Sequence, residues 1–387
     1  MLKQPISITG FSSISALGNT QEEIWKKYLD TKPLISYQNF NGIETPVSKL
    51  AVAQNETLEK IREENSNYKN LDRSVLLALA ASRHCIKEAG WYNTVNFGVN
   101  IGSSRGATEL FERYHQEFLQ QKLASTLSSP TTTLGNISSW VAQDLQSAGP
   151  DISHSITCST ALHAVLNGIA WLQSDLCDKF LVGGSEAPLT AFTIAQMKAL
   201  KIYASKNNTD YPCRALDLDK NKNTMFLGEG AGMVCLEKGK NNKAKALITG
   251  IGYATEPLKH HISISTEATC FQKSIKMALK DKTLSEIDAV VMHAPGTIKG
   301  DLSEYNAIKQ VFGSNLPALT TNKWKIGHTF GASGILSLEL AILMLQNQKI
   351  IPVPFLENQK LPKKLERILV NAVGFGGNAV SVLVERV

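Results

Sequence analysis

Several features that would assign a chain to a specialised class are missing from this 387-residue sequence. Its six cysteines form no CxxC pair and show no regular spacing, which argues against a disulfide framework and against a zinc site. The net charge of +6 is spread along the chain without a basic block, so nothing indicates nucleic-acid binding. No apolar run approaches the ~20 residues that span a bilayer, and the N-terminus lacks the apolar segment of a signal peptide. These absences predict a cytoplasmic protein without a membrane span.

What is present is the composition of an ordinary globular protein, with 43% hydrophobic and 19% charged residues. The chain is long for one simple domain, so two halves are expected. Predicted strands and helices alternate, which is typical of an α/β protein, and the alternation restarts after a lysine-rich break at residues 238–245. We therefore place one half at residues 1–245 and the other at 246–387, and we expect a duplicated architecture although no plain sequence repeat is present.

The pattern of apolar residues and breakers gives the approximate elements. In the first half we expect strands at residues 5–10, 97–102, 152–157, 179–184 and 233–237, and helices from 21, at 72–89, from 108, at 138–148 and after Cys158. In the second half we expect strands at 246–253, 287–293, 316–320, 350–354, 367–373 and 379–385, and helices at 266–280, 302–312 and 333–347. The polar segments 32–70 and 205–224 are predicted to be irregular surface. Thr20 should cap one helix and Gly90 should end another.

Cys158 lies where a short run of alternating β-branched and polar residues gives way to an apolar segment. Residues 161–172 are apolar nearly all round, which predicts a buried helix. The first turn of a helix offers free N–H groups and the positive end of the helix dipole, and both favour a thiolate. Cys158 is therefore a candidate nucleophile. The alternative is a cysteine that is simply packed among apolar residues.

Three further stretches stand at predicted strand ends or helix starts. His293 follows an apolar strand. The segment 321–334 contains Lys323 and His328 and leads into a second apolar helix. The third stretch is the glycine loop at residues 374–377, between two β-branched runs. Each stretch alone is weak evidence, because a histidine after a strand is commonly structural and a glycine loop is commonly a tight turn.

Taken together and in this order, the four stretches resemble the elongating β-ketoacyl-acyl carrier protein synthases of the thiolase superfamily. The resemblance covers essentially the whole chain, from ITG near the N-terminus through GGSEAP and LGEGAG to the last strand. A Cys–His–His set is typical of the elongating branch, since chain-starting members have asparagine at the position of His328. The resemblance implies an α/β thiolase-like fold in which two similar halves form a five-layer α-β-α-β-α sandwich.

The resemblance also assigns roles to individual residues. Cys158 matches the nucleophile that accepts the acyl group, and His293 and His328 match the two catalytic histidines. Lys323 matches the lysine that holds the charge balance of the site, and two carboxylates, Asp301 and Glu304, match its acidic partners. From the residues alone, these two are equally an N-capping aspartate and a first-turn glutamate of a helix.

The implied reaction is a decarboxylative Claisen condensation of a malonyl unit with the acyl group on Cys158. Phe375 matches a gating phenylalanine, and its backbone N–H together with that of Cys158 would form the oxyanion hole. Thr297, Gly374 and Gly376 are expected to contact substrate. No metal or cofactor is implied, because both substrates arrive on the phosphopantetheine arm of an acyl carrier protein.

The sequence also departs from the family pattern. Pro295 stands where a threonine is usual, so one hydrogen bond to the pantetheine arm would be missing. Ser337 stands where glutamate is common, and Glu339 follows two positions later. These changes indicate a divergent member, serving fatty acid synthesis or a specialised polyene or polyketide pathway. They do not fix the acyl chain length.

Two other functions stay open at this point. A non-condensing, chain-length-determining subunit would share the fold, although such subunits typically lack the cysteine. A thiolase or acyltransferase that uses coenzyme A would need a different arrangement of cysteine and histidine. The implied partners are an acyl carrier protein and either a second copy of the chain or a second ketosynthase-like chain.

Overall fold

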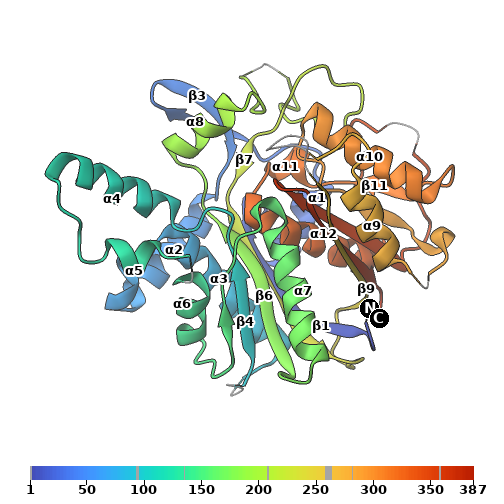
Figure 1. Ribbon diagram of the computed structural model, residues 1–387, viewed down its shortest axis with the longest axis horizontal. Helices are drawn as coiled ribbons and strands as arrows, with labels where there is room; N and C mark the ends of the chain where they lie inside the picture. The colour runs from blue at the N-terminus through green and yellow to red at the C-terminus, as the bar shows by residue number, and fades with distance from the viewer. Residues whose placement is uncertain are drawn as a thin grey trace.

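The computed structural model describes residues 2–92, 96–134, 136–206, 209–257, 264–280, 282–356 and 359–387. Two five-stranded sheets form its centre, with helices between them and on their outer faces (Figure 1). The first sheet contains, in spatial order, β1 (Ile6–Ser15), β8 (Gly230–Lys238), β6 (Lys179–Glu186), β4 (Gly98–Gly102) and β5 (Asp151–Ile152). The second contains β9 (Ala246–Thr255), β13 (Asn378–Glu385), β12 (Arg367–Gly374), β10 (Ala289–Val291) and β11 (Ala318–Thr320).

The two sheets have the same topology. If the five strands of each sheet are numbered 1 to 5 along the chain, both sheets have the spatial order 1-5-4-2-3. In both sheets the pairs 1-5 and 5-4 are antiparallel, and the pairs 4-2 and 2-3 are parallel. The duplicated architecture expected from the alternation of elements is therefore confirmed, although the two halves share no plain sequence repeat.

The helices complete five layers. Helices α7 (Thr160–Gln173) and α12 (Ser333–Asn347) pack against each other and against both sheets, in the middle layer. Helix α3 (Arg73–Ala89) covers the outer face of the first sheet, and α9 (Thr269–Ala278) covers that of the second, with α10 (Ile298–Phe312) packed on α9. Equivalent helices of the two halves thus follow equivalent strands, which confirms the expected α-β-α-β-α sandwich.

Helix α12 is the most deeply buried helix segment of the core. Together with the turn before it, Phe330–Asn347 is long and apolar enough to cross a membrane by length and composition, but 89% of it is buried inside the protein. A helix that is apolar all round is stable only where every face is covered. The two sheets and α7 provide that cover, so the segment is a core helix of the sandwich.

Several local predictions are confirmed. Thr20 accepts a hydrogen bond from the Glu23 N–H as the N-cap of α1 (Gln21–Leu29), and Gly90 ends α3 with φ of 68°.

The remaining elements are α2 (Val52–Glu64), α4 (Thr108–Gln121), α5 (Ser128–Thr132), α6 (Asn136–Asp144), α8 (Ala191–Ala199), α11 (Lys323–Ile326), β2 (Ser36–Phe40), β3 (Ile43–Ser48), β7 (Leu227–Gly228) and the 3-10 turns Ser66–Tyr68, Thr157–Ser159, Leu284–Glu286 and Phe330–Ala332.

Other local predictions are wrong. The segment 32–70 is not irregular, since β2, β3 and α2 lie within it. No strand forms at 350–354, where Pro352 and Pro354 cannot donate to a sheet. The strand before Cys158 ends at Ile152, because the chain there leaves the sheet to approach the second half.

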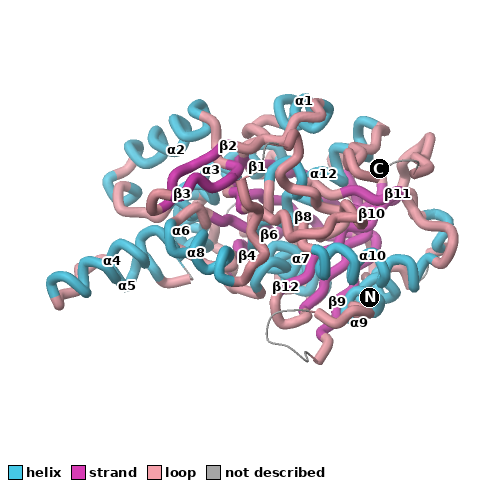
Figure 2. Tube along the Cα trace, turned by 90° about the horizontal axis from the view of Figure 1, so that it is seen from above, coloured by secondary structure: helices cyan, strands magenta, loops and turns pink. Residues whose placement is uncertain are grey.

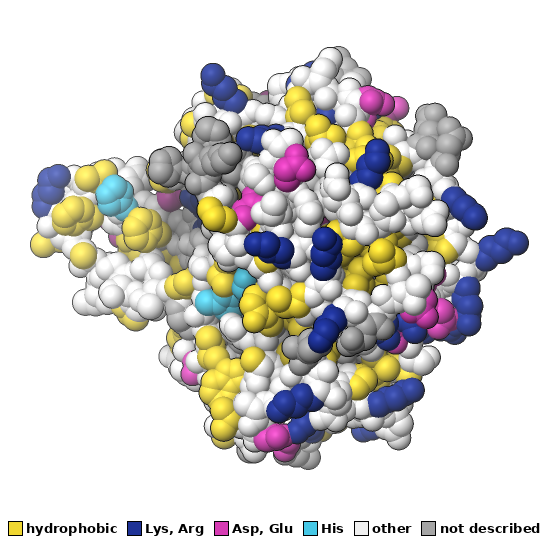
Figure 3. Space-filling view, turned by 45° about the vertical axis from the view of Figure 1, so that its right-hand side comes forward, with side chains coloured by type: hydrophobic (Ala, Val, Ile, Leu, Met, Phe, Trp, Pro, Cys, Tyr) yellow, Lys and Arg dark blue, Asp and Glu magenta, His cyan; other side chains and the backbone are white. Residues whose placement is uncertain are grey.

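An arm formed by α4 and α5 projects away from the body of the molecule (Figures 1 and 2). Its surface carries large apolar side chains, seen at the left of Figure 3. Those that are exposed are Phe111, Phe118, Leu119, Leu123 and Leu127. Exposed apolar groups gathered on one element typically mark an interaction surface.

Candidate functional site

Cys158 lies on a strained turn at the start of α7. Thr157, immediately before it, has φ of 47°, a left-handed conformation that is unusual for a β-branched residue. The turn lets the chain pass from the edge of the first sheet into the buried helix and brings Cys158 against the second half. Only 6% of Cys158 is exposed. Strain of this kind is held in place by the surrounding packing and is common at active sites.

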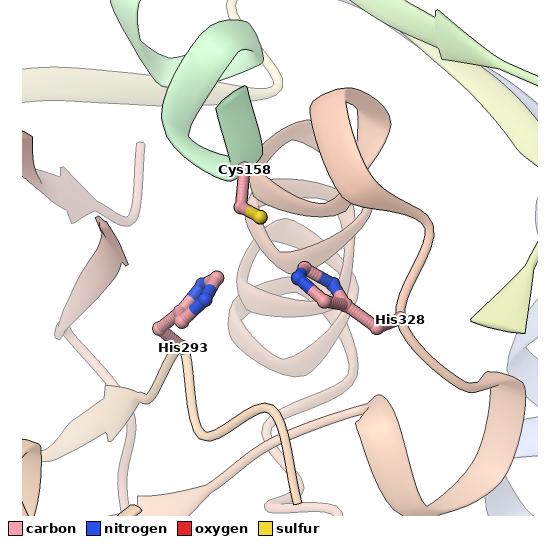
Figure 4. Close-up of side chains that lie close together, drawn as sticks. All are labelled: Cys158, His293 and His328. Carbon is pink, nitrogen blue, oxygen red and sulfur yellow. The ribbon is translucent and has the colours of Figure 1, made fainter. Parts of the chain in front are cut away.

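The two predicted catalytic histidines approach Cys158 from the second half. His293 follows β10, and His328 follows the short helix α11, so both stand beyond the ends of parallel strands. Ligand atoms of the three side chains all lie within 4.8 Å of one another. The two imidazole rings are 5.2 Å apart, nearly perpendicular, and point towards the sulfur (Figure 4). The fold therefore brings together three residues that are separated by up to 170 positions in the sequence.

The sequence predicted surroundings that favour a Cys158 thiolate, but the electrostatic environment in the structure favours the thiol. Burial raises the pKa of the thiol to about 12, and the nearby carboxylate of Glu186 adds to the rise. The positive charge of Lys323 and the backbone N–H of Cys158 act in the opposite direction but do not compensate. A pKa raised this far favours the protonated thiol, so a proton must be lost if this sulfur is to act as a nucleophile.

Both histidines are neutral at physiological pH. Burial lowers the pKa of His293 and of His328 well below the ordinary value. The charge of Lys323 lowers both further, and His328 also acts on His293. The Nδ1 atoms of both rings have no hydrogen-bond partner among the described residues. A neutral imidazole can donate one hydrogen bond and accept another, so each ring can present an N–H to an oxygen in the site.

Lys323 is the charged group behind the histidines. It is fully buried, and burial lowers its pKa to about 8. The negative charge of Glu304 is the largest effect that raises this pKa again. Its Nζ lies 3.3 Å from Asn322 Oδ1 and 3.4 Å from Ser337 Oγ. Ser337, one of the departures from the family pattern, thus contacts the lysine directly.

The two carboxylates predicted as partners of Lys323 make their direct contacts elsewhere. Asp301 forms a buried ion pair with Lys220 at 2.7 Å and accepts hydrogen bonds from the N–H groups of Leu216 and Gly296. Asp301 acts on Lys323 through its charge, as expected of an acidic partner, while its direct ion-pair partner is a second buried lysine on the loop at 209–224.

Glu304 accepts hydrogen bonds from the N–H groups of His293 and Ala294, at 3.0 and 2.9 Å, and from Asn371 Nδ2 at 3.2 Å. It reaches Lys323 through its charge, without an ion pair among the described residues. Burial raises the pKa of Glu304 to about 7, which the three donated hydrogen bonds partly offset. Its direct structural effect is to fix the backbone that carries His293.

An apolar pocket of about 530 Å³ opens beside the three residues. Thr297, Gly374 and Phe375, all predicted to contact substrate or to gate the site, line it, and so does Pro295. Gly376 is not among its lining residues and adopts φ of 106° in the turn after β12. Phe375 is 40% exposed, and its carbonyl accepts a hydrogen bond from Thr157 Oγ1 at 3.4 Å.

Some residues of the site were missed from the sequence. Glu186 is fully buried and accepts hydrogen bonds from Ser103 Oγ and from the N–H groups of Ser104 and Gly331, so it ties the two halves together beside Cys158. Phe330 lines the pocket and stacks edge-on against His328 at 5.4 Å. Helix α8 supplies Met197 to the pocket wall. The apolar spacing of residues 191–200 is the signal that indicates this helix.

Proximity alone does not define the chemistry of this site. A cysteine with two histidines is also the minimum donor set of a catalytic zinc centre. The neutral imidazoles, the protonated thiol and the adjoining apolar pocket equally suit a nucleophile with two hydrogen-bond donors.

Two family models match the chain: the beta-ketoacyl synthase N-terminal domain over residues 3–242 and the beta-ketoacyl synthase C-terminal domain over residues 245–357. Among curated proteins, 3-oxoacyl-[acyl-carrier-protein] synthase 2 of Vibrio cholerae is 25% identical over the full length of both chains. The Staphylococcus aureus protein of the same name is 26% identical, covering 97% of this chain and 99% of the relative.

Solved structures match over nearly the whole chain. A beta-ketoacyl synthase from Burkholderia phymatum has a TM-score of 0.84 at 21% identity and covers 99% of this chain and all of that one. A ketosynthase in complex with its chain length factor from Xenorhabdus doucetiae has a TM-score of 0.80 at 22% identity, covering 99% and 98%. A type II polyketide synthase acyl-carrier protein complexed with its ketosynthase has a TM-score of 0.86 at 18% identity, covering 99% and 100%.

Proposed function

The chain belongs to the β-ketoacyl synthase family, and from this premise we propose that it condenses malonyl-acyl carrier protein with an acyl group carried on Cys158. The observation that carries the proposal is the convergence of Cys158, His293 and His328 within 4.8 Å at the wall of an apolar pocket. The site holds a nucleophile, two neutral hydrogen-bond donors and space for an apolar chain. These are the parts that a condensing acyltransferase needs.

The first half-reaction loads the acyl group. Cys158 sulfur attacks the thioester carbonyl of an acyl carrier protein, and the carrier's pantetheine sulfur leaves with the proton that the thiol gives up. The backbone N–H groups of Cys158 and Phe375 would stabilise the tetrahedral oxyanion. Because burial raises the pKa of this thiol to about 12, the proton has to be removed during the loading step.

The second half-reaction forms the carbon–carbon bond. A malonyl thioester loses carbon dioxide, and the electrons of the broken bond move to an enolate whose oxygen accepts hydrogen bonds from His293 and His328. Donors aimed at such an oxygen are each worth about 10²–10³ in rate. The enolate carbon then attacks the acyl thioester and releases Cys158. Lys323 supports this step because its charge adds to burial in lowering the pKa of both imidazoles, which favours their neutral form.

The partners are part of the proposal. An acyl carrier protein delivers both substrates, and one structural neighbour is itself an acyl-carrier protein in complex with its ketosynthase. The exposed apolar arm at 108–132 supports a dimer, formed with a second copy or with a ketosynthase-like chain. In a heterodimer this chain is the active half, because Cys158 and both histidines are present. The alternative, a non-condensing chain-length-determining subunit, gives those three residues no role.

We place the reaction in the cytoplasm, in fatty acid synthesis or in a specialised polyene or polyketide pathway. All six cysteines are free and buried, which suits a reducing compartment. The departures at Pro295 and Ser337, together with neighbours described as polyketide or chain-length-factor ketosynthases, favour the specialised pathway.

The test is a condensation assay. Malonyl-acyl carrier protein and acyl carriers of several chain lengths are incubated with the enzyme, and carbon dioxide and the β-ketoacyl product are measured. Product that depends on both substrates supports the proposal, and the preferred chain length indicates the pathway. The proposal would be contradicted if no acyl chain length gave product, either with this protein alone or with a ketosynthase-like protein that co-purifies with it.

A further inference from the structure

One charged side chain lies in the mostly apolar helix α12. Glu339 is only 3% exposed, and its Oε2 accepts a hydrogen bond from Ser13 Oγ of β1 at 2.7 Å. Its other oxygen, Oε1, is buried and has no hydrogen-bond partner among the described residues. An ionised carboxylate in a protein interior is costly unless it is paired. A cation that pairs with Oε1 would offset that cost, in competition with the proton that the buried carboxyl holds.

Glu339 lies in the wall of a second cavity, of about 460 Å³, with wall residues that differ from those of the Cys158 pocket. The wall is formed by β1, the start of α1 and one face of α3. The same wall includes residues with neutral hydroxyl or amide oxygens, namely Ser12, Asn19, Thr20 and Gln21. Such oxygens can complete the coordination shell of a small cation or accept hydrogen bonds from an ammonium group.

Of the carboxylates in the described wall of the cavity, Glu339 is the one left without a full set of partners. Glu88, on α3, accepts hydrogen bonds from Phe11 N–H at 2.9 Å and from Gln21 Nε2 at 2.6 Å, and it lies 3.7 Å from Lys245 Nζ. His84 and Lys87, also on α3, are exposed, so water screens them. Tyr28 of α1 interacts with Glu339 electrostatically.

We propose that this cavity binds a small monovalent cation, a potassium-sized ion or a primary ammonium group, with Glu339 Oε1 as its counter-charge. One free carboxylate matches one positive charge, whereas calcium sites commonly combine several carboxylates and magnesium usually retains its waters. The site is independent of the condensing reaction, since it shares no lining residue with the Cys158 pocket.

The state of the carboxylate agrees with such a site. Burial raises the pKa of Glu339 to about 8, and the charge of Glu88 raises it further. A bound cation favours the ionised form, so binding releases a proton and becomes tighter as the pH rises. Besides Glu339, the titratable side chains in the described wall of the cavity are His84, Lys87, Glu88 and Tyr92, and Tyr28 interacts with Glu339 electrostatically.

The test is the unfolding midpoint at constant ionic strength, with choline chloride exchanged for potassium chloride, ammonium chloride or methylammonium chloride. At about ten times the dissociation constant, the wild-type midpoint should rise by about 2 °C. Glu339→Gln keeps the shape and the Ser13 contact but loses the charge, so its midpoint should not respond. Glu23→Gln, which removes a partly exposed carboxylate of α1, should respond as the wild type does.

The salts also identify the occupant. A response to potassium alone indicates an inorganic ion, and a response to both ammonium salts indicates an amine. An equal response in Glu339→Gln, or none in the wild type, overturns the proposal. If Glu339→Gln does not fold, a wild-type crystal soaked in rubidium chloride replaces it: an anomalous peak in contact with Glu339 Oε1 supports the site, and a clear map without one contradicts it.

Discussion

Removing one imidazole should damage one half-reaction and spare the other. His293 and His328 are placed to donate hydrogen bonds to an enolate oxygen, whereas acyl transfer to Cys158 relies on backbone N–H groups. Loss of one preorganised donor costs about 10²–10³ in rate, or ~2.7–4 kcal/mol of transition-state stabilisation. We therefore expect His293→Ala and His328→Ala each to lower malonyl decarboxylation by that factor, and the acylation rate to stay within about tenfold, or ~1.4 kcal/mol.

The two half-reactions can be measured separately. Release of carbon dioxide from malonyl-acyl carrier protein follows decarboxylation, and rapid-quench intact mass follows acylation of Cys158. His328→Asn, which keeps an N–H donor on a shorter side chain, should lose less activity than His328→Ala. His115→Asn, on the exposed arm, should behave as wild type in both assays. If acylation falls as far as decarboxylation, or if decarboxylation survives in both alanine variants, the assigned roles are wrong.

Three further results are expected. Lys323→Met removes the positive charge that lowers the pKa of His328, so that pKa rises and the acid limb of the pH–rate profile moves to higher pH; an unmoved limb would contradict the role of Lys323. Gly374→Ala places a Cβ 1.9 Å from Thr157 Oγ1, so the turn before the nucleophile must shift. The free energy of unfolding, measured with denaturant, should fall by about 1–3 kcal/mol. The double variant Gly374→Ala/Thr157→Ala should recover part of that loss. The pKa of Glu339 is raised from 4.5 to about 8 in the folded state, so the folded protein holds the proton more tightly than the unfolded chain does. The free energy of unfolding should therefore fall as pH rises from about 4.5 to 8, by at most ~1.4 kcal/mol per pH unit. Calorimetry of Glu339→Gln should show a shallower dependence of stability on pH, and an identical dependence would refute this reasoning.

Strong local patterns in the sequence predicted the α/β class and the duplication, and the resemblance to β-ketoacyl synthases implied the five-layer arrangement. The apolar character of α12 predicts a helix at 333–347, which is where it lies. The restart of strand–helix alternation predicts a duplication, and the two sheets have matching topology. The prediction for segment 32–70 was wrong because β2 is short and mostly polar and β3 is buried over its last four residues, so neither strand shows a regular alternation of apolar and polar residues.

The site was predictable in its membership and not in its electrostatics. Cys158, His293, His328 and Lys323 are recognisable from their order along the chain. The protonation state of Cys158 is not, because it depends on how deeply the turn is buried and on Glu186, which is 28 positions away in sequence but near Cys158 in the fold. The ion pair of Asp301 with Lys220 was likewise missed, since it joins residues 81 positions apart through the packing of a loop.

The most direct test of the account is the mass of the intact protein after incubation with acyl carrier proteins of several chain lengths. Wild type should gain the mass of one acyl group, and Cys158→Ala should gain none. Cys213→Ala is the matched control, because burial also raises the pKa of that thiol to about 12 while Cys213 does not line the pocket. This variant should be acylated like wild type. An acyl adduct that persists in Cys158→Ala would contradict the central claim that Cys158 carries the acyl group.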